Sequence, residues 1–382
     1  MRFLFTFAGG AGHADPLVPV ARAVGLAGHA VAFSGRASVT NDLAARGFVV
    51  FGDASAIADP PPQRLPLAEL DPEREDLVLR YGFADRIARA RAAGIAEVCS
   101  KWRPDVVVHD EVDFGAAIAA ERLGIPHATV LVVAAGSFVR SEIVAESLDV
   151  VRADLGLAAD PDLVMLRGGL VLSPFPPSFR DPAFPLPAGT HSFRPDRLEP
   201  VIDAPAYLSS GNDRPDTPTV YFTLGTIFNL ESGDLFTRVL TGLRELPIEV
   251  VVTVGRNVDT DEVGPQPVNV HIERFIPQSM VLPYCDLVVS HGGSGSVVGA
   301  LAHGLPQVVL PMGADQPLNA ARIEALGLGR TLDARRATSE MVRSTVESLF
   351  AHPGYASAAQ RVQSEIDALP GPESTVARLE RM

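Results

Sequence analysis

The sequence is poor in several features that would point to whole classes of protein. Only 2 of its 382 residues are cysteines, Cys99 and Cys285, so a disulfide framework is not expected. Long apolar runs are missing as well: the N-terminal "MRFLFTF" stops at a glycine cluster after about six residues, too few for a signal peptide or a membrane span. Positive charge is also scarce, because 32 Lys and Arg stand against 46 Asp and Glu, which gives a net charge of −14. We therefore expect a cytoplasmic protein with no nucleic-acid partner and no membrane partner.

The chain has the composition of a soluble globular enzyme, with 47% hydrophobic and 20% charged residues. Its length suits two domains of about 150 residues each. Short β-rich apolar runs alternate with helix-like stretches, a pattern that predicts βαβ units and parallel sheets. The expected strands cover residues 2–7, 30–34, 48–51, 105–109 and 128–133 in the first half, and 219–226, 248–255, 269–275, 285–293 and 306–311 in the second. The predicted fold class is α/β, with two Rossmann-like domains that face each other across a cleft.

Composition also suggests the boundaries of these domains. We predict an N-terminal domain over 1–205, a linker over 206–218 in a stretch rich in Pro, Asn and Ser, and a C-terminal domain over 219–365. A C-terminal helix over 366–382 follows, and whether it packs back on the first domain is left open. Within the first domain, the Pro-rich acidic stretch 58–76 is too long for an ordinary connection and is expected to be a loop. A helix is expected over 85–102, before Pro104.

The loop "FTFAGGAGHADP" (5–16) invites comparison with the dinucleotide motif GxGxxG. The third glycine is replaced by Asp15, and the second strand ends in "FSGR" without an acidic residue for a ribose hydroxyl, so hydride transfer is disfavoured. Instead, the small residues display His13 at the carboxyl end of the first strand, which is where ligands bind in open α/β sheets.

A partner for His13 is predicted in "DVVVHDEVDF" (105–114), a strand that ends in His109, Asp110, Glu111 and Asp113. The first and fourth strands of a doubly wound sheet can lie side by side, so these side chains can meet His13. A carboxylate bound to an imidazole fixes its tautomer and leaves the other nitrogen as a general base. The spacing fits equally well a solvated loop or the cap of the following helix.

The second half contains an apolar strand that runs into His291-Gly-Gly-Ser-Gly-Ser296 and then a helix. Unpaired N–H groups at such a helix N-terminus suit a phosphate without a metal, although a tight turn can need glycine for closeness alone. Asp315 and Gln316 open the next helix and suit sugar hydroxyls, or merely start the helix. "TLGT" adds Thr226 as a phosphate contact, and "RFIPQ" (274–278) offers an aromatic ring and an amide for a base. We therefore predict a pocket for a nucleoside diphosphate sugar, and no metal role for "DTD" (259–261).

At this point the sequence resembles the two-domain glycosyltransferases of the GT-B fold, and most closely the bacterial natural-product branch of family 1, which modifies macrolides, enediynes and glycopeptides. The resemblance rests on "GGAGHADPLVPVARAV", "PDVVVHDEVDFGAAIAAERLGIPH", "YFTLGT" and the long segment from "NVHIERFIPQ" to "ADQPLNAARIEALGLG". It implies an inverting, metal-independent glycosyltransferase with no cofactor. Its co-substrate is a nucleoside diphosphate sugar, with a TDP-deoxysugar suggested and UDP left open. A homodimer is left open too.

The resemblance also assigns roles to residues. His13 matches the general base that takes a proton from the acceptor hydroxyl, and Asp110 matches the acid that supports it. The residues implied for donor binding are Thr226, Phe275, Ile276, Gln278, His291, Gly292, Gly293, Ser294, Gly295, Ser296, Asp315 and Gln316. A hydrophobic aglycone is assigned to Gly12, Phe83 and Phe138, although the phenylalanines are equally compatible with a core. Gly299 stands where plant relatives have a ribose-binding Glu.

Two other functions are left open. One is a sugar-nucleotide epimerase of the same fold, which would need further acid and base groups at the sugar. The other is a non-catalytic helper protein that binds the sugar nucleotide. The presence of both His13 and Asp110 disfavours this alternative.

Overall fold

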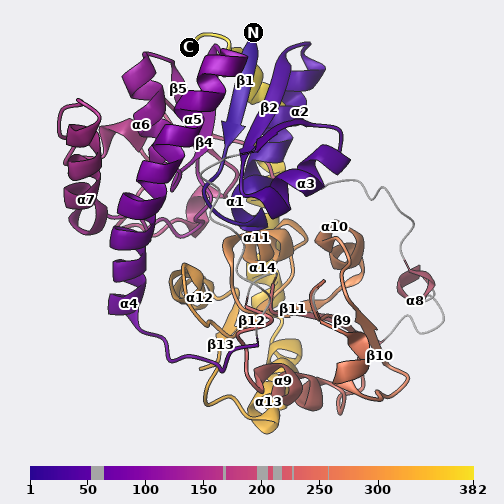
Figure 1. The fold of residues 1–382 in the computed structure, drawn as a ribbon. Coiled ribbons are helices and arrows are strands. Elements are labelled where there is room, and N and C mark those ends of the chain that lie inside the picture. The colour runs from indigo at the N-terminus through magenta and orange to yellow at the C-terminus, as the bar shows by residue number, and fades with distance from the viewer. Residues whose placement is uncertain (53–63, 167–168, 196–204, 210–216, 226–227, 257) are drawn as a thin grey trace. The chain divides into compact units, whose positions relative to one another are not determined.

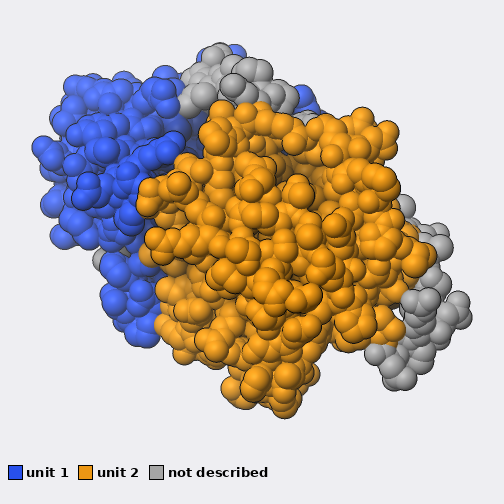
Figure 2. Space-filling view, turned by 90° about the horizontal axis from the view of Figure 1, so that it is seen from below, with its two compact units in different colours: residues 1–60, 71–196, 368–382 blue, residues 61–70, 197–367 orange. Residues whose placement is uncertain are grey.

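The computed structural model describes residues 1–52, 64–166, 169–195, 205–209, 217–225, 228–256 and 258–382. Residues 58–63 of the expected loop, 210–216 of the expected linker, and Thr226 lie outside the described residues. The chain divides into two compact units, coloured differently in Figure 2: residues 1–60, 71–196 and 368–382 form unit 1, and residues 61–70 and 197–367 form unit 2. Within the described residues, no helix is both long and apolar enough to cross a membrane.

Unit 1 is built on a parallel sheet of seven strands in the order β3-β2-β1-β4-β5-β6-β7. The strands are β1 (Arg2–Thr6), β2 (Ala30–Gly35), β3 (Val49–Gly52), β4 (Val106–Asp110), β5 (His127–Val130), β6 (Leu170–Ser173) and β7 (His191–Ser192). The order reverses between β1 and β4, which pair directly, with Thr6 opposite His109. Loops that follow these two strands therefore meet at the switch point of the sheet, where doubly wound folds bind ligands.

The sheet of unit 1 is covered on both faces, as Figure 1 shows. Phe3 and Phe5 of β1 point to the face that carries α2 (Val18–Leu26) and α3 (Ala37–Ala45). Leu4, between them, points to the opposite face, where α5 (Ala88–Trp102) and α6 (Phe114–Leu123) pack. A strand that is buried on both sides needs apolar residues at consecutive positions, which is why "FLF" has no polar alternation. The remaining helices of unit 1 are α1 (Ala11–Ala14), α4 (Pro72–Leu77), the π-helix Val78–Ile87, α7 (Ser141–Asp154) and α15 (Val376–Leu379).

Unit 2 repeats this plan with six parallel strands in the order β10-β9-β8-β11-β12-β13. They are β8 (Thr219–Thr223), β9 (Glu249–Thr253), β10 (Val270–Glu273), β11 (Leu287–Ser290), β12 (Gln307–Val309) and β13 (Gly329–Thr331). One face packs on α9 (Leu235–Leu243) and α13 (Ser339–Ala351), and the other on α10 (Gln278–Val281) and α11 (Ser294–Ala302). The other helices are α8 (Ala206–Ser209), α12 (Gln316–Ala325) and α14 (Gly354–Ala368). The expected α/β class with two Rossmann-like sheets is confirmed, and the switch point of this sheet lies between β8 and β11.

The expectation of a loop over 58–76 is wrong for its last residues. Helix α4 begins at Pro72, because the Asp71 side chain accepts hydrogen bonds from the backbone N–H groups of Glu73 (3.1 Å) and Arg74 (3.2 Å). An N-cap residue followed by proline, here Asp71 and Pro72, is a helix start signal. It was not recognised because the surrounding acidic, Pro-rich sequence is also typical of a loop. The helix predicted over 85–102 therefore begins earlier, as α4 continues through the π-helix into α5.

The C-terminal segment also differs from a single helix over 366–382. After α14, the chain forms a 3₁₀ turn (Pro372–Thr375) and the four-residue α15. Leu379 of α15 is fully buried in the core of unit 1, beside residues of α2.

Candidate active site

His13 lies on α1, immediately after β1, at the switch point of unit 1. Its backbone N–H donates to the carbonyl of Gly10 at 3.0 Å, which closes the turn that carries the side chain. The ring lies directly against Gly9, where an added β-carbon would be only 2.1 Å from the imidazole Cδ2. The side chain is 27% exposed, so one edge of the imidazole remains open to solvent.

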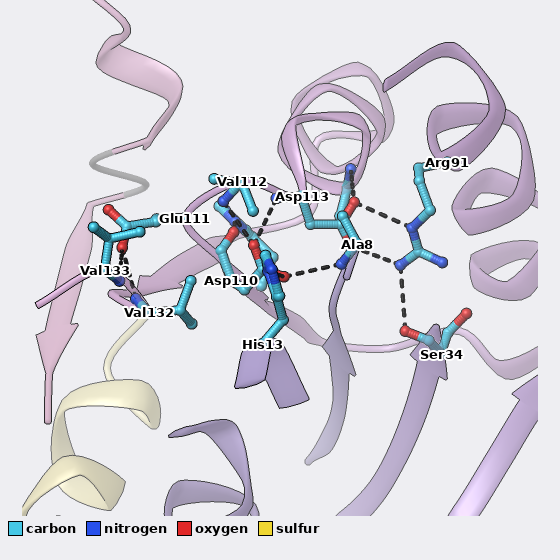
Figure 3. Close-up of polar contacts among 12 residues, drawn as sticks. Ala8, His13, Ser34, Arg91, Asp110, Glu111, Val112, Asp113, Val132 and Val133 are labelled. Carbon is cyan, nitrogen blue, oxygen red and sulfur yellow. Dashed lines mark hydrogen bonds and ion pairs between the residues drawn. The ribbon is translucent and has the colours of Figure 1, made fainter. Parts of the chain in front are cut away.

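Asp110 ends β4 and binds His13, so the residue that the resemblance assigned is the one of the four candidates at this strand end that meets the histidine. Its Oδ2 is 3.2 Å from His13 Nδ1 and accepts the backbone N–H of Ala8 at 2.9 Å. Its Oδ1 accepts the backbone N–H groups of Val112 (2.6 Å) and Asp113 (2.8 Å), and all these contacts appear in Figure 3. Burial disfavours the charged carboxylate, but the charge of His13 and the hydrogen bonds from His13, Ala8 and Val112 outweigh it and lower the pKa of Asp110.

The ionised Asp110 decides which nitrogen of His13 carries the proton. A carboxylate can only accept, so Nδ1 of the neutral imidazole must be the donor, and Nε2 carries the acceptor lone pair. The arrangement can therefore take a proton at Nε2 and stabilise the imidazolium that results.

His109 points away from His13 and joins a second, buried pair. Its Nδ1 is 2.9 Å from the Asp110 carbonyl, and its Nε2 is 3.0 Å from Nδ1 of His127. Burial lowers the pKa of His109, and burial together with His109 lowers the pKa of His127 to about 3. Both rings are therefore neutral at pH 7 and hold the backbone at Asp110 without adding charge.

The two other acids of this strand end have structural partners of their own. Oε1 of Glu111 accepts the backbone N–H groups of Val132 (2.6 Å) and Val133 (2.5 Å), and burial raises the pKa of Glu111. Asp113 caps α6 by accepting the N–H of Ala116 at 3.3 Å. The two readings that the sequence left open therefore both apply, to different residues: Asp110 meets the histidine, and Asp113 caps the helix.

The three residues assigned to an acceptor lie in different surroundings. Phe83, on the π-helix, is nearly parallel to the His13 ring, with 6.2 Å between centroids and 11° between planes. Gly12 is exposed, one residue before His13. Phe138 packs against two apolar clusters of unit 1 and is partly buried there. Phe83 and Gly12 thus lie beside the histidine, whereas Phe138 has the contacts of a core residue.

Asp15, the residue in place of a third glycine, pairs with Arg46 at 3.7 Å. Its carboxylate is thus already engaged by a cation at the C-cap of α3.

In unit 2, His291 follows β11 at the corresponding switch point. Two glycines flank its ring: a β-carbon at Gly225 would be 2.6 Å from Cε1, and one at Gly293 would be 2.7 Å from Nε2. The side chain is 9% exposed, and its Nδ1 is buried without a hydrogen-bond partner among the described residues. Burial lowers the pKa of His291 to about 4, so the ring is neutral at pH 7 and can offer a hydrogen bond but no charge.

Gly292 and Gly293 lead into α11; the N-cap residue Gly293 has no side chain to cap the helix, and the backbone N–H of Ser294 donates to the Asp315 carboxyl. Gly292 adopts φ +86°, a left-handed conformation that strains any other residue. Ser294 and Gly295 form the first turn of α11, and a β-carbon at Gly295 would meet nothing within 4 Å. The first N–H groups of a nine-residue helix, with its partial positive charge, thus lie beside a neutral imidazole, which suits an anion.

Asn319, which the sequence did not single out, joins the starts of α11 and α12. Its Nδ2 lies 2.9 Å from the Gly292 carbonyl, 3.1 Å from Ser294 Oγ and 2.8 Å from Asp315 Oδ2. Ser294 also donates to Asp315 Oδ2 at 2.5 Å, and burial raises the pKa of that carboxyl. Asn319 is fully buried on α12, where its only sequence signal is an amide one helical turn after Asp315.

The two residues predicted to contact sugar hydroxyls both have partners within unit 2: Asp315 binds Ser294 and Asn319, and Gln316 binds its own loop. Oε1 of Gln316 accepts the backbone N–H groups of Met312 (2.8 Å) and Gly313 (3.3 Å), and the side chain is 1% exposed. Asp315 is the N-cap residue of α12, as the alternative reading expected, although its side chain makes no capping hydrogen bond.

The residues predicted to lie near the nucleobase and ribose of the donor nucleotide form a separate group. Phe275 is 43% exposed, and the guanidinium carbon of Arg256 lies 3.9 Å from its ring centre. Ile276 is buried in the core behind it. Gln278 donates to Ser296 Oγ at 3.1 Å, and its Oε1 is 3.0 Å from the position that a β-carbon at Gly299 would take. The amide of Gln278 thus fills the space beside Gly299.

The "DTD" triplet forms a helix start. Asp259 accepts the N–H of Asp261 at 3.3 Å, and its own N–H donates to Glu262 at 3.2 Å. Among the residues that the structure describes, no group of three or more His, Cys, Asp or Glu residues is placed to share a metal ion.

Comparisons with known proteins agree with this architecture. Residues 237–382 match the family described as "Erythromycin biosynthesis protein CIII-like, C-terminal domain". The tylactone mycaminosyltransferase of Streptomyces fradiae is 28% identical over 100% of this chain and 92% of its own. The elloramycin glycosyltransferase of Streptomyces olivaceus is 30% identical over 79% of this chain and 73% of its own. The crystal structure of the glycosyltransferase VinC in complex with dTDP superposes with a TM-score of 0.77 and 25% identity, and the match covers 100% of this chain and 99% of the other.

These relatives are named as glycosyltransferases, and the likeness extends over both units. The two parallel sheets, each with its polar residues at the switch point, are the architecture on which that activity is built. The chain therefore belongs to the natural-product glycosyltransferases of the GT-B fold, and it is an enzyme of that class.

Proposed function

We propose that the enzyme transfers the deoxysugar of a thymidine diphosphate deoxysugar to a hydroxyl of a hydrophobic natural-product aglycone. The transfer inverts the anomeric carbon and uses no metal. The observation that carries this proposal is the pair of His13 and the ionised Asp110. The epimerase and helper functions do not fit a family whose named members transfer sugars.

The base of the proposed reaction is Nε2 of His13. It accepts the proton of the acceptor hydroxyl while that oxygen bonds to the anomeric carbon and the bond to the diphosphate oxygen breaks. Asp110, held by three backbone N–H groups and the Nδ1 contact, stabilises the imidazolium. A single displacement of this kind inverts the anomeric centre, and positioned proton removal contributes about 10²–10⁴ in rate.

The leaving diphosphate is assigned to the start of α11. Charge that develops on its oxygens would be stabilised by backbone N–H groups in the first turn of α11 and by the neutral imidazole of His291. Because these donors supply the stabilisation that a divalent ion would otherwise give, we propose no metal requirement.

The donor and acceptor classes rest on the relatives. The mycaminosyltransferase acts on tylactone by its name, and VinC was crystallised with dTDP. In this chain, Gly299 has no side chain to bind a ribose diol at the position where plant relatives have Glu, and Gln278 occupies the space beside it. We therefore place a thymidine nucleotide ahead of UDP.

Calorimetric titration of the protein with TDP, UDP, GDP and NADH in the presence of EDTA tests the donor site. We expect TDP to bind most tightly and NADH not to bind. Preference for UDP would overturn the donor assignment, and loss of TDP binding in EDTA would overturn metal independence.

Transfer from TDP-deoxysugars to a panel of macrolactone and anthracyclinone aglycones tests the reaction. NMR of the product should show an inverted anomeric configuration. His13→Ala should lose about 10²–10⁴ in turnover and keep its affinity for TDP. Unchanged turnover in this variant, or a retained configuration in the product, would refute the proposed mechanism.

A further inference from the structure

A buried ion pair lies behind Asp110 and has no part in the mechanism above. The guanidinium of Arg91, on α5, donates to the Asp113 carboxylate twice, from Nη2 to Oδ2 at 2.6 Å and from Nε to Oδ1 at 3.2 Å. The side chains are 7% and 0% exposed. Nη2 of Arg91 also donates to the carbonyl of Ser34, at the end of β2, at 3.2 Å. Figure 3 shows this pair on the side of Asp110 away from Glu111.

Asp113 connects this pair to the catalytic carboxylate through the backbone. Its own N–H donates to Oδ1 of Asp110 at 2.8 Å, while its side chain is fixed by Arg91 and by the N–H of Ala116. The turn from Asp110 to Asp113 is therefore held at both ends. Any rotation of the peptide before Asp113 would withdraw a donor from Asp110.

The reach of Arg91 depends on a close contact between α5 and α6. A β-carbon at Gly115 would lie 2.3 Å from the carbonyl oxygen of Ala88 and 2.6 Å from Cβ of Arg91. Only glycine lets the two helices approach this closely at the point where the guanidinium meets the turn.

We propose that Arg91 and Asp113 are positioning residues, which act through the Asp110 turn to set the tautomer and proton affinity of His13. Arg91 locks the start of α6 against the end of β2, and Asp113 passes that restraint to Asp110 by its N–H. The inference rests on the proposed function of His13 as the base.

A purely structural role is the competing explanation. A buried ion pair often contributes little to stability compared with neutral residues of similar shape, since desolvation offsets the attraction. A charge-neutral replacement of both residues should therefore fold and reveal any effect on His13. The double variant Arg91→Met/Asp113→Asn removes one charge of each sign, so its effect on His13 comes from geometry and not from net charge.

The probe is the ring of His13, followed by NMR of protein labelled at its 9 histidines, with His13→Gln used to assign the signal. Asp110 favours the protonated imidazole, so loosening their contact should lower the titration midpoint of His13 by about 1 pH unit. It should also turn a single Nδ1–H tautomer into a mixture. TDP affinity should stay as in the wild type.

The matched control is Arg152→Met/Glu121→Gln, which removes another ion pair of unit 1 (2.6 Å, side chains 8% and 27% exposed). It should leave the midpoint and the tautomer of His13 unchanged. A folded Arg91→Met/Asp113→Asn protein with wild-type midpoint and tautomer would overturn the inference. If this double variant does not fold, Arg91→Lys takes its place, because it keeps the charge but loses the bidentate contact with Asp113. An unchanged titration midpoint of His13 in Arg91→Lys would equally overturn the inference.

This readout needs no acceptor, so it is independent of whether the proposed reaction is correct. Loss of turnover in His13→Ala together with an unmoved His13 midpoint in the double variant would refute the positioning role alone.

Discussion

The imidazole of His13 lies against the backbone of Gly9, where a β-carbon would be 2.1 Å from Cδ2 and 2.3 Å from Nε2. A ring held this way has its position set by two contacts, Gly9 on one side and Asp110 on the other. Gly9, the first glycine of the loop, is therefore explained by the close approach of the His13 ring, and no pyrophosphate is needed to account for it.

Gly9→Ala should displace the His13 ring and reduce turnover about 10²-fold, the cost of misplacing a reacting group by about 1 Å. Its affinity for TDP should not change, because the donor residues belong to unit 2. Transfer assays and calorimetry on the same preparation measure both. Gly25→Ala on α2 is the control, since a β-carbon there has only Val31 nearby, at 3.9 Å. Wild-type turnover in Gly9→Ala would show that the ring position does not matter.

Gly293→Ala should weaken TDP binding, because the new β-carbon would lie 2.7 Å from Nε2 of His291 and force that ring to move. We expect a loss of at least about tenfold in affinity, or about 1.4 kcal/mol. Gly354→Ala, where nothing lies within 4 Å of the added carbon, should bind TDP normally. Equal affinity in the two variants would remove His291 from the diphosphate site.

Most of the architecture could be predicted from the sequence, because a strand buried on both faces gives an apolar run that is easy to see. The segments around β1, β4, β8 and β11 are of this kind, and they carry the switch points. Strands β7 and β13 were missed because they have two and three residues and no such run. Strand β6, "LVLS", is a buried apolar run of the same kind, and the predicted strands did not include it. The start of α4 at Pro72 was not predicted, because its N-cap residue Asp71 lies in a Pro-rich stretch that is also typical of a loop.

The meeting of His13 with the end of β4 could be predicted because strand order alone brings the ends of β1 and β4 together. Strand order could not predict which of the four polar residues at the end of β4 would meet His13, because that depends on how the turn from Asp110 to Asp113 folds. Only the family resemblance pointed to Asp110. Arg91 gave no signal, because it lies on a helix and reaches its partners only through tertiary packing. Asn319 gave only a weak one, its spacing of one helical turn from Asp315, because its bonds to Gly292 and Ser294 also depend on tertiary packing. Thr226 lies outside the described residues, so its role stays a prediction.

Asn319→Ala should weaken donor binding although Asn319 is fully buried. Its amide holds Gly292, Ser294 and Asp315 together, so its loss frees the starts of both α11 and α12 and leaves buried acceptors unpaired. We expect TDP affinity to fall about tenfold, a cost of about 1–2 kcal/mol for one buried hydrogen-bonding group. Asn269→Ala, which removes a single 2.8 Å amide bond to the Ile248 carbonyl away from the site, is the control. If both variants bind TDP like the wild type, Asn319 only stabilises the fold.

The neutral histidines of unit 1 should make that unit sensitive to acid. His127 has its pKa lowered to about 3 by burial and by His109, against about 6.5 in an unfolded chain. Between these values the unfolded state binds the proton and the folded state does not. Stability is therefore complete above pH 6.5 and falls as the pH drops, by about 1.4 kcal/mol per unit.

His127→Gln should remove this loss while its amide can still donate to His109 Nε2. Between pH 7.5 and pH 5.0 the wild type should then lose about 2 kcal/mol more stability than the variant. Trp102, the one tryptophan of the sequence, lies on α5, so its fluorescence during urea unfolding reports on unit 1. Comparison of the two proteins cancels the contributions of the buried carboxyls, which are the same in both. Parallel stability curves over this range would mean that His127 takes up its proton in the folded state as readily as in the unfolded chain, and the buried neutral pair with His109 would be wrong.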